Sequence, residues 1–136
     1  MPDFRHVTED FTTAPQISVA DVAEAAGLGF ATIICNRPDG EDPGQPSTAE
    51  IAAAAHAAGL AYVHIPFSGP PGPAQVEAMR QAVEASEGPV LAYCRSGTRS
   101  ITCWSIGQAM SGAMGRGDLV SLGRAAGYDL SGALGG

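Results

Sequence analysis

The sequence predicts a single α/β domain, with a mainly parallel central sheet of about four to five strands and helices on both faces. Short, nearly continuous apolar segments alternate with segments of helical periodicity, which is the pattern of parallel strands joined by helices. The chain has 136 residues, of which 45% are hydrophobic, and this is enough for one ordinary core. We therefore expect one domain over residues 1–136, with a poorly ordered Gly-rich tail from about residue 131.

The first half of the chain is predicted to form helices and strands in alternation. The expected elements are a helix from about Val19 to Ala26, a strand over 30–35, a helix from Ser47 through Ala58 and a strand over 61–65. Ser18 is a suitable cap for the first helix, and Ser47-Thr48-Ala49-Glu50 has the spacing of a capping box. Both strand segments are apolar with β-branched residues, and a Pro- and Gly-rich loop from Asn36 to Gly44 ends the first of them.

The second half continues the same alternation. The expected elements are a helix through Val76 and Val83, a strand over 90–93, a helix from about Ile101 to Ala113 and a last helix from about Asp118 to Ala126. Apolar residues recur at helical spacing in each helix, and Gly88-Pro89 must end the first of them. The segment that follows Tyr93 therefore joins a strand to a helix.

Composition makes several classes of partner and location unfavourable. Fourteen acidic residues face seven Arg and no Lys, so the formal charge is −7, which disfavours nucleic acid or an anionic membrane as the main partner. The N-terminus lacks the pattern of a signal peptide, and no segment is apolar enough to span a bilayer, so we expect a cytoplasmic protein. The three cysteines, Cys35, Cys94 and Cys103, suit neither a disulfide framework nor a zinc site. We expect free thiols, no metal and no cofactor.

The loop between the strand over 90–93 and the next helix has the composition of a reactive anion-binding site. It reads Cys94-Arg95-Ser96-Gly97-Thr98-Arg99-Ser100. A thiol at a helix start lies among backbone N–H groups that lack helical partners, and the helix dipole favours its thiolate. Gly97 permits a positive φ, so the amides can form a nest for a tetrahedral oxyanion, while Arg99 can grip two of its oxygens. We expect Cys94 and Arg99 to be catalytic and Arg95, Ser96, Gly97, Thr98 and Ser100 to bind the oxyanion.

A second charged loop follows the strand over 30–35. It contains Arg37, Asp39, Glu41 and Asp42. Because the carboxyl ends of parallel strands lie at one edge of a sheet, this loop and the Cys94 loop are expected to meet across one crevice. We expect Arg37 to bind the oxyanion as well, and Asp39 is our first choice for a general acid among the three nearby carboxylates.

These residues carry a resemblance to a known family. The segments concerned are Asn36-Arg37-Pro38-Asp39-Gly40-Glu41, Tyr62-Val63-His64-Ile65-Pro66 and Pro89 to Ser100. They closely resemble the phosphatase-like domain of beta-lactamase-hydrolase-like proteins, and the resemblance covers nearly the whole chain. It implies a fold similar to protein tyrosine and dual-specificity phosphatases. Members of the family are described both as phosphatases and as sulfur transferases.

The sequence departs from the dual-specificity phosphatases at two points. Those enzymes place a His before the Cys and five residues between the Cys and the Arg, whereas here Tyr93 precedes Cys94 and four residues separate it from Arg99. They also place an Asp general acid after the strand that matches Tyr62 to Pro66, where this chain has Phe67-Ser68-Gly69. Rhodaneses hold a cysteine persulfide in a loop of the shorter length, so loop length favours sulfur transfer and the rest of the match favours phosphatase.

Three functions remain open from the sequence. A Cys-dependent phosphatase would attack a phosphate monoester through Cys94 and form a phosphocysteine, with Ser100, by resemblance, bonded to the sulfur. A sulfurtransferase would carry a sulfane sulfur on Cys94 as a persulfide. A binding module would hold an anion without turnover. The expected partner is a phosphorylated or sulfane-sulfur small molecule, or a phosphoprotein, and the sequence specifies no oligomeric state.

Overall fold

The computed structural model describes residues 2–135. Its strands are β1 (Arg5–His6), β2 (Phe11–Ala14), β3 (Thr32–Cys35), β4 (Ala61–His64) and β5 (Val90–Tyr93). Its helices are α1 (Val19–Gly27), α2 (Thr48–Ala57), α3 (Pro73–Ala85), α4 (Thr98–Ser111) and α5 (Arg116–Ala126). The helices begin where capping was predicted: the Ser18 side chain accepts from the Asp21 N–H, and the Ser47 side chain accepts from the Glu50 N–H.

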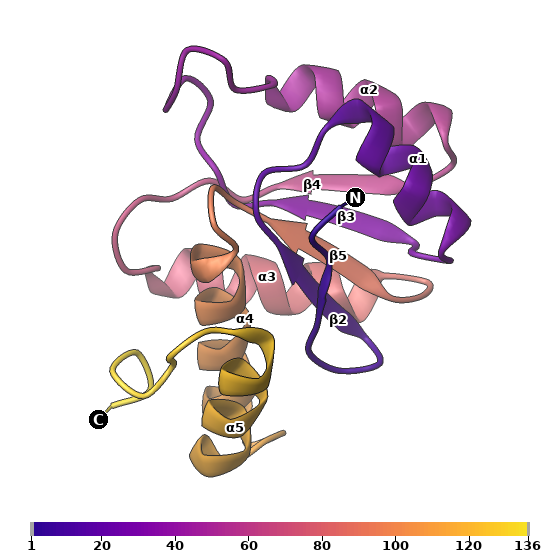
Figure 1. Ribbon diagram of the computed structural model, residues 1–136. Coiled ribbons are helices and arrows are strands. Elements are labelled where there is room, and N and C mark those ends of the chain that lie inside the picture. The colour runs from indigo at the N-terminus through magenta and orange to yellow at the C-terminus, as the bar shows by residue number, and fades with distance from the viewer. Residues whose placement is uncertain (1, 136) are drawn as a thin grey trace.

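The strands form one five-stranded sheet in the order β1-β2-β5-β3-β4. Only the β1–β2 pair is antiparallel; β2, β5, β3 and β4 are parallel neighbours. Cys35 is the register partner of both Tyr93 and His64, so these strands end level with one another. The predicted α/β fold with a mainly parallel sheet is therefore confirmed, and the carboxyl ends of its parallel strands lie at one edge (Figure 1).

Helices cover both faces of the sheet (Figure 1). One core cluster joins the sheet to α3, α4 and α5 through buried residues such as Met79, Ile101 and Leu119. The other joins the opposite face to α1 and α2 through Val22 and Ile51. Strands buried on both sides carry near-continuous apolar runs, which is why β3 and β5 could be located from the sequence.

Two features of the chain ends were not foreseen. No strand is predicted before residue 19, but β1 and β2 form a hairpin there, and β2 is the direct neighbour of β5. Thr12 and Thr13 interrupt the apolar run of β2, which hid it from a search for continuous apolar strands. At the other end, Leu134 packs against the α4 side of the core. The poor order expected from about residue 131 stays a prediction.

Candidate active site

The Cys94 loop connects β5 to α4, as predicted. β5 ends at Tyr93, Gly97 is the N-cap of α4, and α4 begins at Thr98. Gly97 has φ +92°, and a Cβ built on it would overlap the hydroxyl of Tyr128, so both the backbone conformation and the lack of space require glycine. The loop therefore turns sharply around Cys94, whose side chain is fully buried at the base of the turn.

A backbone amide of this loop faces its thiol. The Gly97 N–H donates to Cys94 Sγ at 3.1 Å. On the outer side, three successive carbonyls accept from groups outside the loop: Arg95 from the Gln16 N–H at 3.2 Å, Ser96 from the Tyr128 hydroxyl at 2.8 Å, and Gly97 from the Thr13 hydroxyl at 3.0 Å. Because C=O and N–H point in opposite directions across a trans peptide, the N–H groups of Ser96 and Gly97 point inward, whereas the Thr98 N–H donates to Ser96 Oγ at 3.4 Å. This is the geometry of an anion-binding nest.

Arg99 is held beside the loop by the facing loop. Its Nη1 donates to Glu41 Oε2 and to the Phe67 carbonyl, both at 3.0 Å, and its Nη2 donates to Glu41 Oε1 at 2.8 Å. These bonds leave Nε–H and one Nη2–H without an acceptor among residues 2–135, and together they form one planar edge of the guanidinium. Glu41 therefore fixes Arg99 and leaves one bidentate edge for an oxyanion.

The same contacts set the charge on Glu41. Hydrogen bonds from Arg99, opposed by burial and supported by Arg37, lower the pKa of Glu41 to about 2. The bond with Glu41 also raises the pKa of Arg99. At neutral pH Glu41 is thus an anion that holds two guanidinium groups, and it has no proton to give to a substrate.

Arg37 lies beneath the facing loop, with a side chain only 3% exposed. It donates to Glu41 Oε1 at 2.9 Å, to Gln16 Oε1 at 3.0 Å and to Asp42 Oδ2 at 2.6 Å. Asp42 also lies 3.6 Å from Arg95 Nε, but the Arg95 side chain is 68% exposed. The two loops therefore meet, as predicted, and are joined by ion pairs. The contacts of Arg37 are with protein groups, and its expected role in oxyanion binding stays a prediction.

Asp39 and Ser100 have surroundings that the sequence did not indicate. The Asp39 carboxylate accepts from the Thr48 N–H at 2.7 Å, in the first turn of α2. The Ser100 hydroxyl is fully buried and has no partner among residues 2–135, so no bond to Cys94 Sγ is formed. Asp39 as the general acid stays a prediction, and its geometry favours a capping role. Ser96 and Thr98 are exposed at the loop surface, where their hydroxyls bond each other at 3.0 Å.

The other two cysteines are also buried: Cys35 ends β3 as the register partner of Tyr93, and Cys103 lies within α4. Burial raises the pKa of the Cys35 thiol, which donates to the Arg37 carbonyl at 3.4 Å. Burial raises the pKa of Cys103 to about 12. Both are free thiols, as is Cys94. Both of these thiols donate to backbone carbonyls, whereas Cys94 Sγ is the one cysteine sulfur in the described part of the chain that accepts a hydrogen bond from a backbone N–H.

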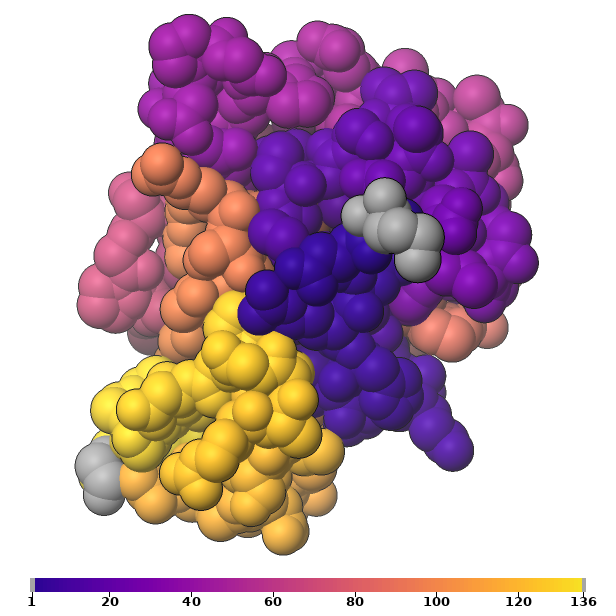
Figure 2. All heavy atoms as spheres, viewed as in Figure 1, coloured from indigo at the N-terminus to yellow at the C-terminus, as the bar shows by residue number. Residues whose placement is uncertain are grey.

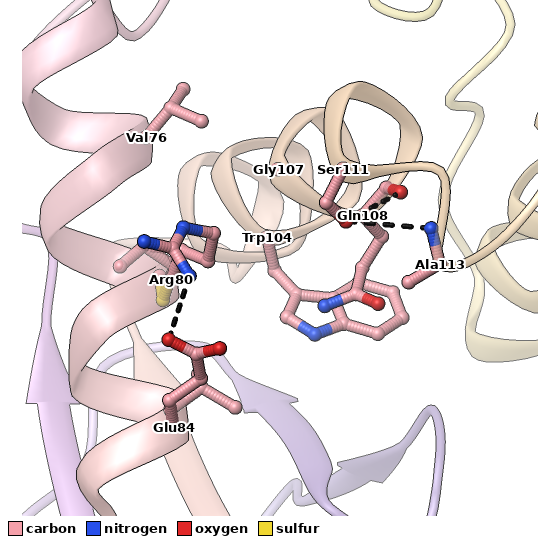
Figure 3. A pocket seen from close by; sticks show the side chains of 10 residues that line it. Val76, Arg80, Glu84, Trp104, Gly107, Gln108, Ser111 and Ala113 are labelled. Atoms are coloured by element: carbon pink, nitrogen blue, oxygen red, sulfur yellow. Dashed lines mark hydrogen bonds and ion pairs between the residues drawn. The ribbon is translucent and has the colours of Figure 1, made fainter.

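A cavity of about 140 Å³ lies between α3 and α4 (Figure 3). It is lined by Val76, Met79, Arg80, Val83, Glu84, Trp104, Gly107, Gln108, Ser111 and Ala113. Arg80 at its edge is already paired, donating to Glu84 Oε2 at 2.6 Å and to Glu77. No residue of the Cys94 loop contributes to the lining, so this cavity is separate from the candidate active site.

Two features are absent from residues 2–135. No three His, Cys, Asp or Glu side chains in this range are grouped so that they could hold a metal ion. None of the helices in the same range combines the length and apolar character needed to cross a membrane.

Comparison with known proteins places the chain in a family. Residues 3–111 match the phosphatase-like domain of beta-lactamase hydrolase-like protein. The chain belongs to this family. A beta-lactamase hydrolase-like protein of Agrobacterium fabrum is 42% identical over 125 residues, which are 91% of this chain and 29% of that protein. The chain thus spans less than a third of the length of the curated relatives that it matches.

Solved structures give the same result for the fold of this phosphatase-like domain. A candidate phosphatase of Neisseria meningitidis is 36% identical, with a TM-score of 0.86 over 97% of this chain and 94% of its own. The active form of Tk-PTP is 20% identical, with a TM-score of 0.74 over 96% and 88%. The resemblance read from the sequence is confirmed, and so is the protein tyrosine phosphatase-like fold.

Proposed function

We propose that this phosphatase-like domain is a cysteine-dependent phosphatase that hydrolyses phosphate monoesters. The observation that carries the proposal is the inward-facing set of loop amides around Cys94, next to the free Nε–Nη2 edge of Arg99. Such a site matches the three equatorial oxygens of the phosphoryl group in the transition state of its transfer, where negative charge must be stabilised. Membership of a phosphatase-like family supports the same class of reaction.

In the proposed reaction the Cys94 thiolate attacks phosphorus and the bond from phosphorus to the leaving oxygen breaks. The electron pair of that bond goes to the leaving oxygen, and a phosphocysteine forms. Water then attacks phosphorus, the S–P bond breaks, and Cys94 leaves as a thiolate, with the Gly97 N–H as its hydrogen-bond donor. Phosphate and bulk water take the protons of the attacking water. Arg99 holds the oxyanion throughout, and Arg95, Ser96 and Thr98 line the exposed side of the loop.

Sulfur transfer is the second candidate, and a specific observation favours it. Every carboxylate of the facing loop has a partner: Glu41 and Asp42 with arginines, Asp39 with the Thr48 N–H. Transfer of a sulfane sulfur from thiosulfate to Cys94 expels sulfite, which is stable as an anion and requires no general acid.

Paired assays of the protein and its Cys94→Ser variant test both candidates. We expect turnover of para-nitrophenyl phosphate that is lost in the variant. Thiocyanate formed from thiosulfate and cyanide, without phosphatase activity, would replace the first candidate by the second. Lack of turnover in both assays, with phosphate still bound by both proteins, would leave an anion-binding module. Arg124→Met, on the outer surface of α5, is a matched control for Arg99→Met, which should abolish either activity.

A further inference from the structure

The Cys94 loop is braced from two distant parts of the chain. Thr13 and Gln16 lie in and just after β2, whereas Tyr128 follows α5. Figure 2 shows the C-terminal segment, in yellow, against both the indigo N-terminal residues and the orange stretch that contains the loop. Tyr128 also lies beyond residues 3–111, the part of the chain that matches the family.

The hydrogen bond from Tyr128 is made to the peptide unit whose N–H contacts the Cys94 thiol. Its hydroxyl donates to the Ser96 carbonyl at 2.8 Å, and the other side of the same peptide is the Gly97 N–H, which donates to Cys94 Sγ at 3.1 Å. The peptide unit is planar, so fixing its carbonyl also fixes the direction of its N–H. A rotation of this unit would move the N–H away from the sulfur.

We propose that Tyr128 is a positioning residue for Cys94, whose hydroxyl holds the Ser96–Gly97 peptide in the orientation that stabilises the thiolate. Thr13 supports the same residue from its other side, because its hydroxyl donates to the Gly97 carbonyl. The inference rests on the proposed nucleophilic role of Cys94, but its effect on the thiolate is measurable without turnover.

Tyr128 is itself held firmly enough for this role. Its side chain is buried, with the residue 8% exposed. The Arg5 guanidinium lies 5.1 Å from the centre of its ring and also donates to the Ala126 carbonyl at 3.4 Å. Burial raises the pKa of Tyr128; Arg5 opposes this shift, and a charge on Cys94 adds to it. The hydroxyl therefore stays protonated and remains a donor when Cys94 is ionised.

The test is a pH titration of the ultraviolet absorbance of the Cys94 thiolate. Each protein is compared with the same protein carrying Cys94→Ser, so that the tyrosines and the other cysteines cancel. Tyr128→Phe keeps the ring and removes only the hydroxyl. We expect the midpoint of its titration to rise by about half a unit to one pH unit, since hydrogen bonds to a charged group favour ionisation. Thr13→Val should move the midpoint in the same direction.

Thr12→Val is the matched control for Thr13→Val. Thr12 is also buried in β2 but points to the opposite face of the sheet, and its hydroxyl forms no bond among residues 2–135. Its midpoint should equal that of the unmodified protein. An unchanged midpoint in Tyr128→Phe overturns the proposal, even if the melting temperature falls, because a purely structural role lowers stability alone. If Tyr128→Phe does not fold, an unchanged midpoint in Thr13→Val overturns it.

Failure of the proposed function gives a different result. If the protein turns over neither phosphate esters nor thiosulfate, Tyr128→Phe should still raise the midpoint of the Cys94 titration, because the hydrogen bond from Tyr128 acts on the thiolate and not on turnover. Turnover by the unmodified protein, with no change of the titration midpoint in Tyr128→Phe, would support the proposed function and overturn the positioning role of Tyr128.

Discussion

Glu41 is the residue around which the candidate active site is arranged. It accepts from Arg99 at the mouth of the loop and from Arg37 beneath it, so one carboxylate fixes two guanidinium groups. In the sequence Glu41 was only one of three acids at a strand end. Nothing in its spacing distinguished it from Asp39, because the distinction depends on which way each side chain turns from a loop of irregular structure.

The first prediction concerns the pH dependence of stability. The pKa of Glu41 is lowered from 4.5 to about 2, so the folded state favours the carboxylate. Its contribution is fully present above pH 4.5 and is lost as the pH falls toward 2. The difference in the free energy of unfolding between the protein and Glu41→Gln should therefore be largest at neutral pH and shrink over this range. Urea unfolding at several pH values measures it, and a difference that is independent of pH would contradict it.

The second prediction concerns the leaving group. With Glu41 and Asp42 bound to arginines, the proposed first step expels an unprotonated oxygen, so the rate should fall steeply as the leaving-group pKa rises across a series of aryl phosphates. Asp39→Asn should lower kcat less than about threefold and leave that slope unchanged. A general acid contributes at least about a hundredfold. A loss of that size, confined to poor leaving groups, would establish Asp39 as the acid.

At the scale of elements, α5 and the segment after it pack onto the α4 side of the core. Leu119, Tyr128 and Leu130 belong to the core cluster on the α4 side of the sheet. Gly123 of α5 makes room for this segment, because a Cβ there would lie 2.6 Å from Leu130 Cδ1 and 3.3 Å from the Tyr128 carbonyl. The docking of the segment thus depends on a glycine in the middle of a helix.

The third prediction compares the same substitution at two sites of α5. Gly123→Ala should lower the free energy of unfolding by about 1 to 3 kcal/mol, since the new methyl group displaces Leu130. Gly117→Ala, where nothing lies within 4 Å of the added Cβ, should raise it by up to about 1 kcal/mol through helix propensity. Chemical unfolding of both variants checks this. Equal effects at the two sites would show that Gly123 has no packing role.

The elements also show what the sequence could predict. Helices with caps and apolar strands of the buried sheet were located to within a few residues, because their signals are local. The loop from Cys94 to Ser100 was recognised as a strand-to-helix junction for the same reason. Thr13, Gln16 and Tyr128 were missed as site residues, since none lies in a motif and only the folded chain brings them to the loop. Tyr128 stands 34 positions after Cys94 and has no neighbour in sequence that suggests its role.

At the scale of the whole molecule, the segment that carries the Cys94 loop differs in charge from the rest of an acidic protein. The chain carries a net charge of −7, yet from Gly88 to Gly117 it has arginines and no carboxylate. One of these, Arg116, points to the Ser131 carbonyl at 3.2 Å and takes no part in the loop. Because Asp42 and Glu41 of the facing loop lie against Arg95 and Arg99, affinity for an anion must come from short contacts inside the loop.

The fourth prediction links anion binding to global stability. A ligand that binds only the folded state stabilises it by about 2.7 kcal/mol at a hundredfold excess over Kd. Inorganic phosphate at such a concentration should raise the Tm by about 10 °C. Sodium chloride of equal ionic strength should not, and neither should phosphate added to Arg99→Met. Thermal unfolding measures the shift, and the same rise in Arg99→Met would place the bound phosphate elsewhere.

The bond between Tyr128 and the Cys94 loop has a consequence for biosynthesis. The ribosome adds Cys94 well before Tyr128, and domains acquire their structure progressively as they emerge. A nascent chain therefore holds its cysteine without the hydroxyl that orients the adjacent peptide. If Tyr128 positions Cys94 as we propose, the thiol reaches its final surroundings only after the last helix has been translated, and an unfinished chain lacks this contact.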